Sequence, residues 1–267
     1  MSVTYKNAPL IELIAELRWG AAAVSPPANQ PATLRVSMPK SKDEELFMHF
    51  GAVVSAEGFT RFERVIPPGF PIPVGQVACR FRPTDPGQDA PLYQLGVGVF
   101  TANALPPYES WAKFNPCVRR GIEALFTAHG RAGLSAPDFS AAMVRYIDAF
   151  RDNLTGGAHV LDFLRDVMKI DLVIPDVVTS RATDRAAIQP RIHITMPTAT
   201  GLLEMSVAEG QYANERAVLF DMTVLIQRPI GPSIDAAMST LAEGRQLIHD
   251  MFRGLTGPLH TAMEPTT

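Results

Sequence analysis

The chain has little of what marks an extracellular or membrane protein. It holds only two cysteines, Cys79 and Cys117, and they form neither a CxxC pair nor a metal-ligand spacing. A disulfide-stabilised fold would need more of them, so we expect both to be buried as small hydrophobic residues. No run of about 18 apolar residues indicates a membrane span. Glu12 and Glu16 interrupt the N-terminal stretch where a signal peptide would be apolar. We therefore expect a cytoplasmic protein.

Charge is also scarce in this sequence. Charged residues make up 19% of the 267 positions, and the net charge is −3, whereas an average soluble protein has roughly 25% charged residues. A nearly neutral chain has no bulk attraction for nucleic acid or for anionic lipid, so we expect neither as a partner. Hydrophobic residues reach 46%, which argues against a disordered chain and predicts a substantial core.

The common catalytic motifs are missing as well. The sequence has no P-loop, no GxSxG and no HExxH, and its six histidines are scattered singly. Gly96-Val97-Gly98 is a GxG, but we place it in the middle of a strand, and it lacks the third glycine and the following helix of a dinucleotide-binding motif. We expect no cofactor and no metal, with a metal site assembled from distant elements as the alternative.

Alternation of apolar and polar residues predicts most of the strands. In residues 11–19 the odd positions are apolar, whereas Glu12, Glu16 and Arg18 lie on the opposite face; a helix after Pro9 is the alternative. We expect 77–81 and 92–100 to form a hairpin pair. The further strands are predicted at 139–150, 191–196, 202–208 and 217–227.

Capping signals and apolar stripes predict the helices. Ser41-Lys42-Asp43-Glu44 has the form of a capping box, and the apolar stripe after it ends at Gly58. Asn115 before Pro116 predicts the start of a second helix that Gly130 ends. A shorter helix is expected over 160–168, and the longest, an amphipathic helix, begins after Ser233. Proline clusters within 26–31, 67–73 and 83–91 predict loops.

The order of these elements indicates the fold class. A strand, a helix, several strands and a helix are followed by the same order again. This predicts an α+β protein of antiparallel sheets with helices packed on one face and a long C-terminal amphipathic helix. Residues 1–135 and 136–267 would be two pseudo-repeated halves, either as two domains or as one continuous domain. We expect Leu241 and Ile248 to be deeply buried in the last helix.

The first candidate site is the polar face of the strand at 11–19. Glu12 and Glu16 are four residues apart, which places them roughly 13 Å apart along a strand. Two carboxylates that act on one bond need a separation of about 5–9.5 Å, so these two do not suit an acid/base pair. Salt bridges on an exposed sheet face, including Arg18, are the expected role, and ligand binding is the alternative.

The second candidate is Arg145-Tyr146-Ile147-Asp148, which interrupts an otherwise apolar strand. Arg145 would lie on one face of the strand, and Tyr146 and Asp148 on the other. A buried charge must be paired, so a structural ion pair is the expected role of Arg145, and a ligand contact is the alternative. The candidate partners are Glu16 as first choice and Glu12 or Asp221 next.

The third candidate is aromatic. Tyr108, Trp111 and Phe114 follow one another at spacings of three, just before the second predicted helix. Such a group usually fills the space between a sheet edge and a helix. A binding surface around Trp111 is the alternative.

These stretches resemble a known family. Tyr5-Lys6-Asn7-Ala8-Pro9-Leu10-Ile11-Glu12, continuing to Glu16-Leu17-Arg18-Trp19, is similar to the opening of the TIGR04255 family, whose members occur sporadically among bacteria. The aromatic triplet, the Arg145–Asp148 segment and the C-terminal helix agree in order and spacing, so the resemblance covers nearly the whole chain. It differs at Asp148, where the family leads us to expect asparagine. The resemblance implies a bacterial source and a soluble α+β protein, and it implies no established activity.

The sequence therefore predicts a non-catalytic binding or regulatory module. It would present a sheet face, or a cleft between its halves, to a protein partner, with a small-molecule ligand as a further possibility. A weak homodimer is expected, because edge strands must be covered. One alternative is a hydrolase or transferase that uses Glu12, Glu16, Arg145 and Asp148 between the halves. Another is a small-molecule carrier with a cavity between the sheet and the long helix.

Overall fold

The structure, a computed structural model, describes residues 4–23, 36–37, 41–184 and 188–266. The proline cluster within 26–31 and the side chain of Ser41 lie outside this description. The helices are α1 (Ser41–Ser55), α2 (Trp111–Arg131), α3 (Asp152–Thr155), α4 (Val160–Asp166), α5 (Asp176–Thr179) and α6 (Ile234–Leu255), with 3-10 turns at Gly20–Ala23 and Gly257–Leu259. The strands are β1 (Thr4–Tyr5), β2 (Leu10–Trp19), β3 (Val36–Ser37), β4 (Arg61–Arg64), β5 (Ile72–Pro73), β6 (Val77–Arg82), β7 (Leu92–Gly96), β8 (Val99–Ala104), β9 (Phe139–Phe150), β10 (Arg191–Pro197), β11 (Leu202–Tyr212), β12 (Glu215–Gly231) and β13 (Pro265–Thr266).

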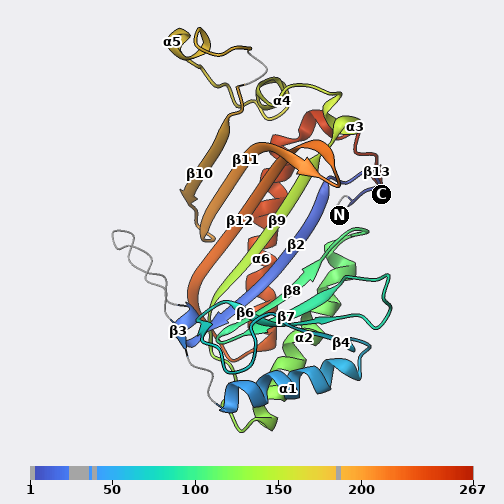
Figure 1. Ribbon diagram of the computed structural model, residues 1–267, viewed down its shortest axis with the longest axis vertical. Coiled ribbons are helices and arrows are strands. Elements are labelled where there is room, and N and C mark those ends of the chain that lie inside the picture. Colours follow the sequence, from blue (N-terminus) through green and yellow to red (C-terminus); the bar gives the residue numbers. More distant parts are fainter. Residues whose placement is uncertain (1–3, 24–35, 38–40, 185–187, 267) are drawn as a thin grey trace. The chain divides into compact units, whose positions relative to one another are not determined.

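Nine of these strands form one sheet (Figure 1). Their order is β10-β11-β12-β9-β2-β8-β7-β6-β4, and two small sheets pair β1 with β13 and β3 with β5. The pairs β10/β11, β2/β8, β8/β7, β7/β6 and β6/β4 are all antiparallel. The α+β class with antiparallel pairing is thus confirmed.

By its internal contacts the chain divides into two compact units. Unit 1 comprises 1–11, 145–224 and 245–267, and unit 2 comprises 12–144 and 225–244. Both units take residues from the halves 1–135 and 136–267, so neither unit coincides with a half. The repetition of one half by the other stays a prediction.

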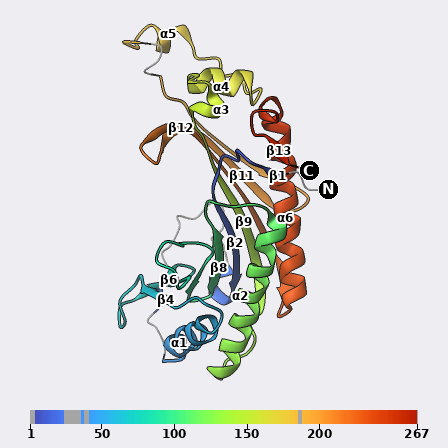
Figure 2. The same cartoon turned by 90° about the vertical axis from the view of Figure 1, so that its right-hand side faces the viewer.

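The core of unit 2 lies between its strands and the helices α1 and α2. Phe50 of α1 meets Phe81, Tyr93 and Phe100 with ring centroids 5.0, 6.0 and 5.9 Å away. A Cβ at Gly121 of α2 would come within 2.6 Å of both Tyr93 and Phe100, so glycine permits this close approach of helix and sheet. The two helices pack side by side on one face of these strands, as Figure 2 shows.

The strand β2 confirms the alternation expected for residues 11–19. Leu13, Ala15 and Leu17 are at most 1% exposed on the helix-covered face. Glu12, Glu16 and Arg18 have the opposite parity and lie on the other face of the sheet. The helical alternative after Pro9 is therefore wrong for this segment.

In unit 1, aromatic rings join the sheet to the C-terminal helix. Phe150 of β9 stacks on Phe252 of α6 at 6.3 Å, and it also contacts Phe163 and Phe220. Tyr5 contacts Phe252 from the N-terminal side of the chain. These contacts fix the last turns of α6 against the residues of this unit.

The Gly96-Val97-Gly98 segment is a hairpin turn, which corrects its placement inside a strand. β7 ends at Gly96 and β8 begins at Val99, with Gly96 paired to Val99. Gly98 has φ +76°, and a Cβ there would come within 2.8 Å of the Trp19 carbonyl oxygen. The expected strand 92–100 is therefore two strands, because this turn requires the left-handed backbone that glycine favours.

The helix α2 begins earlier than Asn115 predicts. It starts at Trp111, and the Ser110 side chain accepts a hydrogen bond from the Lys113 N–H at 3.3 Å. Pro116 lies inside the helix, where it is exposed. A proline near the N-terminus removes only one intrahelical bond, so the serine cap decides the start.

Burial of the long helix yields a stability prediction. Leu241 and Ile248 are both fully buried, as expected from the sequence. Leu241→Ala should lower the free energy of unfolding by about 2–5 kcal/mol, since a cavity remains in a packed interior. Chemical denaturation measures this loss, with Ser239→Ala on the exposed side of the same helix as the control. A loss below about 1 kcal/mol would contradict a structural role for α6.

Candidate functional site

A row of polar side chains crosses the helix-free face of the sheet in unit 2. The pairings Glu63–Arg80, Arg80–Gln94, Gln94–Thr101 and Thr101–Glu16 place these five residues side by side on successive strands. We call them the polar row. Because side chains alternate along each strand, the apolar residues between them lie on the face that α1 and α2 cover.

Hydrogen bonds connect the middle of the polar row. Arg80 Nε donates to Gln94 Oε1 at 2.9 Å. Gln94 Nε2 in turn donates to Thr101 Oγ1 at 3.2 Å and to Asn103 Oδ1 at 3.1 Å. Thr101 Oγ1 donates to Asn103 Oδ1 at 2.7 Å, and Asn103 Nδ2 donates to Glu12 Oε1 at 2.8 Å. The network holds these side chains in one arrangement.

Burial differs along the row. Thr101 and Asn103 are each 2% exposed, and Glu16 is 8% exposed. Arg18 Nε donates to Glu16 Oε1 at 2.6 Å. The expected salt bridge of Glu16 is therefore confirmed, but its exposed position is wrong, because the carboxylate is buried within the sheet face.

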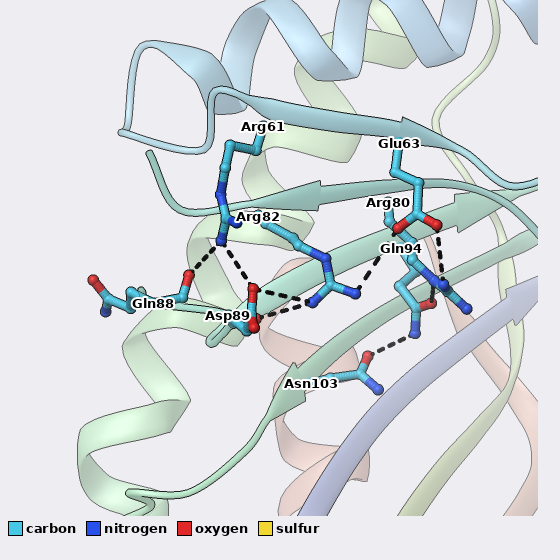
Figure 3. Close-up of polar contacts among 8 residues, drawn as sticks. All are labelled: Arg61, Glu63, Arg80, Arg82, Gln88, Asp89, Gln94 and Asn103. Atoms are coloured by element: carbon cyan, nitrogen blue, oxygen red, sulfur yellow. Dashed lines mark hydrogen bonds and ion pairs between the residues drawn. The ribbon is translucent and has the colours of Figure 1, made fainter. Parts of the chain in front are cut away.

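At the other end of the row the side chains are more exposed and more charged. Arg61, Glu63, Arg80, Arg82 and Asp89 gather there, on β4, β6 and the loop before β7 (Figure 3). We call this group the arginine corner. Three guanidinium groups face two carboxylates, so the corner carries one positive charge in excess.

Arg61 and Arg82 are directly opposite each other on β4 and β6. Like charges in this position repel and weaken strand pairing. The Asp89 carboxylate lies beside both: its Oδ1 is 3.1 Å from Arg61 Nη2 and 4.0 Å from Arg82 Nη1. Arg61 also donates to the backbone oxygens of Pro83 and Gln88, both at 2.6 Å. Asp89 thus offsets the repulsion between the two arginines.

Arg82 is the most loosely held of the three arginines. Within the described part of the chain, its one side-chain hydrogen bond goes from Nη1 to the Asp89 carbonyl oxygen at 3.3 Å, and its Nη2 is 3.9 Å from Glu63 Oε2. Its guanidinium therefore keeps donors that another acceptor can use. The Asp89 side chain is 63% exposed, so the carboxylate that bridges the arginines is open to solvent.

Arg145 has a carboxylate partner, as the sequence predicts. Its Nε and Nη2 donate to the two oxygens of Asp221 at 2.9 and 2.5 Å. This bidentate pair joins β9 to β12 within unit 1. The sequence offers Asp221 as an alternative to Glu16 for this role, and a contact between Arg145 and Glu16 stays a prediction.

Asp148, three residues after Arg145 in β9, is almost completely buried. It is 2% exposed, and its Oδ2 has no hydrogen-bond partner among the described residues. Burial, with a smaller contribution from the negative charge of Asp221, raises the pKa of Asp148 to about 8. The half-buried Tyr146 precedes it on the same strand.

The rings of the aromatic triplet contact one another at the start of α2, and their role between a sheet edge and the helix stays a prediction. Phe114 is 5% exposed and contacts Tyr108 and Trp111, with ring centroids 6.5 and 6.1 Å away. Trp111 is half-buried. A pocket of about 390 Å³ lies beside these rings, and it is lined by Asp89, Tyr108, Phe114 and neighbouring residues.

The candidate residues from the sequence belong to different units. Glu12, Glu16, Arg18 and Trp111 lie in unit 2, whereas Arg145, Tyr146 and Asp148 lie in unit 1. Glu16 belongs to the polar row, where it lies opposite Thr101, and Glu12 is joined to the row through Asn103.

Sequence reasoning missed the arginine corner. Its signal is the alternation Arg-Phe-Glu-Arg in β4 and Arg-Phe-Arg in β6. Phe81 is buried on the face opposite the arginines, and Phe62, which contacts its ring, is 58% exposed. Four residues are too few for a period-two pattern to stand out, so β4 was not predicted at all.

Cys79 and Cys117 are unbridged and buried, as expected. Within residues 4–23, 36–37, 41–184 and 188–266, no three His, Cys, Asp or Glu side chains gather as metal ligands would. Among the helices that the structure describes, none has an apolar stretch that would reach across a lipid bilayer.

Comparisons with known proteins add no relatives. A scan against family models, a search of curated proteins and a search of solved structures each found no match to this chain. The resemblance to the TIGR04255 family stays a prediction.

The Arg145–Asp221 pair can be tested by a double-mutant cycle. Arg145→Met leaves the Asp221 carboxylate without its bidentate donor, so it should lower stability more than Arg145→Met combined with Asp221→Leu does. Because the pair is partly exposed, we expect a coupling of only about 1 kcal/mol. Strictly additive losses in chemical denaturation would contradict the pairing.

Asp148 makes stability dependent on pH. The folded state holds a proton on Asp148 that the unfolded state releases above its ordinary pKa of 3.8. Stability therefore falls as pH rises from about 4 to about 8, by at most ~1.4 kcal/mol per pH unit. Asp148→Asn should remove this slope and raise the melting temperature at pH 7.5.

Calorimetry between about pH 5 and about pH 8, within the range where stability is expected to fall, measures the effect. Asp138→Asn, at an exposed position before β9, is the matched control and should keep the slope of the parent chain. An unchanged slope in Asp148→Asn would show that the carboxyl does not bind a proton in the folded state.

Proposed function

We propose that the protein is a non-catalytic binding module that recognises an acidic segment of a partner protein at the arginine corner. The observation that carries the proposal is the position of Asp89. This exposed carboxylate bridges two arginines that would otherwise repel each other, and it marks where a carboxylate from a partner would bind.

The chemistry of guanidinium suits this role. A guanidinium group presents a planar fork of donors that matches the two oxygens of a carboxylate. Arg82 makes one long hydrogen bond, so a partner carboxylate would gain contacts there without breaking a strong one. The excess positive charge at the corner favours an acidic partner over a basic one.

Hydrogen bonds within the polar row hold the Arg80 side chain of the corner in place. Arg80 is held by Glu63 at one end and by Gln94 at the other, with Nη1 3.4 Å from Glu63 Oε1. Since Gln94 is hydrogen-bonded to the buried Thr101 and Asn103, the partner of Arg80 has a fixed position. A binding site on rigid strands loses less conformational entropy when its ligand binds.

The test uses a hexaglutamate peptide as the probe, titrated at low salt and followed by amide NMR shifts. Arg82→Gln should weaken its binding about tenfold, the loss of one charge-assisted contact. Asp89→Asn should strengthen it, because the competing carboxylate is removed. Arg131→Gln, an exposed arginine at the end of α2, is the control and should bind as the parent chain does.

Two results would overturn the proposal. One is the absence of binding by both the parent chain and Asp89→Asn. The other is an equal loss in Arg131→Gln, which would indicate only general charge attraction. Inorganic phosphate that binds more tightly than the peptide would favour the small-molecule carrier instead.

A second candidate function, a hydrolase or transferase, is favoured by Asp148. A carboxyl that keeps its proton near neutral pH has the protonation state that a general acid requires. Asp148 is 2% exposed, so a substrate would reach it only if β9 or its cover moved. Loss of a measured turnover in Asp148→Asn, with a melting temperature no lower than that of the parent chain, would support this candidate over the binding module.

A further inference from the structure

The strand β10 forms an open edge of the sheet in unit 1. It pairs with β11 on one side, from Arg191 opposite Ala208 to Pro197 opposite Leu202. Among the strands that the structure describes, none lies beyond β10, and Figure 1 shows it at the end of the sheet. An edge of this kind presents backbone groups to which another strand can pair.

The turn after β10 identifies which backbone groups point outward. The Thr198 N–H donates to the Gly201 carbonyl oxygen at 2.8 Å, so these two residues are a hydrogen-bonded pair. Bonding alternates along an antiparallel ladder. Ile194 and its even-numbered neighbours therefore bond to β11, and His193 and Thr195 direct their N–H and C=O groups away from the sheet.

The apolar side chains of β10 continue a buried row. Ile194 lies opposite Met205, and Met196 lies opposite Leu203. Leu203 and Met205 are 2% and 6% exposed, whereas Ile194 and Met196 are each 41% exposed. The apolar face thus runs from the interior onto the edge strand and ends there uncovered.

The strand also lacks the devices that usually protect an edge. Its sequence, Arg-Ile-His-Ile-Thr-Met-Pro, has no lysine, aspartate or glutamate, and its single arginine and its proline stand at the two ends. Natural edge strands commonly carry a central charge that prevents pairing. The centre of β10 is open to another strand.

We propose that β10 pairs antiparallel with β10 of a second copy of this chain, about a twofold axis at Ile194. His193 of one copy then faces Thr195 of the other, and each pair exchanges two backbone hydrogen bonds. The three apolar side chains of each strand meet those of its partner on one face. The strand is complementary to itself in this register, which is why a second copy is the occupant that fits.

The size of the contact indicates a weak dimer. One seven-residue strand and its apolar side chains form a smaller interface than the roughly 1,200–2,000 Å² of stable complexes. The β10 edge belongs to unit 1 and the arginine corner to unit 2, so the two share no residue. Failure of the β10 pairing would therefore leave the proposed recognition of an acidic segment untouched.

A cysteine scan tests the register directly. At the axis, the two copies of Ile194 form a non-hydrogen-bonded pair with Cα atoms about 4.5 Å apart, a separation that a disulfide spans. Ile194→Cys should therefore cross-link into dimers under mild oxidation. Met196→Cys is the matched control with the same exposure. Its two copies would lie about 14 Å apart along the strands, so it should form no disulfide-linked dimer.

Sedimentation of the chain without added cysteines gives the second measurement. The parent chain should dimerise reversibly at about 10–100 µM, as expected for an interface below the standard size. Thr195→Pro removes an outward N–H that β11 does not use, and it should raise the dissociation constant at least about tenfold. Met48→Lys, at another exposed apolar position, should leave the dissociation constant unchanged.

Several outcomes would overturn this proposal. A parent chain that is still monomeric at about 200 µM would contradict the pairing. Cross-linking of Met196→Cys as fast as Ile194→Cys would show a different register or random collision. A dimer that Met48→Lys abolishes and Thr195→Pro leaves intact would place the interface on α1. Circular dichroism of each variant shows that the fold is retained.

Discussion

The side-chain amide of Gln94 is the contact on which the polar face of unit 2 depends. It accepts a hydrogen bond from the arginine corner and donates to the two buried residues of β8. Without it, the side chains of Asn103 and Thr101 would keep, among the described residues, each other and the carboxylate of Glu12 as hydrogen-bond partners. A buried polar group is tolerated only when it is satisfied, so this amide allows a polar layer to exist on a sheet whose other face is aromatic.

The aromatic face and the polar face follow from the same alternation. In β6 and β7, Phe81 and Tyr93 point toward α1 and α2, and Arg80 and Gln94 point away. The packing of rings around Phe50 fixes the positions of the strands, and the strands then fix the spacing of the polar row. The geometry of the arginine corner is therefore coupled to the core of this unit through the backbone that the two share.

Much of the fold can be predicted from the sequence, and the candidate site cannot. The long alternating segments β2, β9 and β12 and the amphipathic α6 carry enough residues for their period to be read. The turn at Gly98 and the serine cap of α2 were missed, because each depends on one residue in its local geometry. The arginine corner was missed because strand pairing brings its members together from separate segments. Which strands pair cannot be predicted from the pattern of a single sequence.

The two edges of the large sheet differ in chemistry, and this difference bears on what each can bind. The edge strand β4 places Arg61 and Glu63 on the polar face, so charges stand along it. The edge strand β10 has uncharged Ile194 and Thr195 at its centre. Charges at an edge oppose the approach of another strand, whereas they attract a partner of opposite sign. An edge of the first kind suits recognition by side chains, and one of the second kind suits pairing through the backbone.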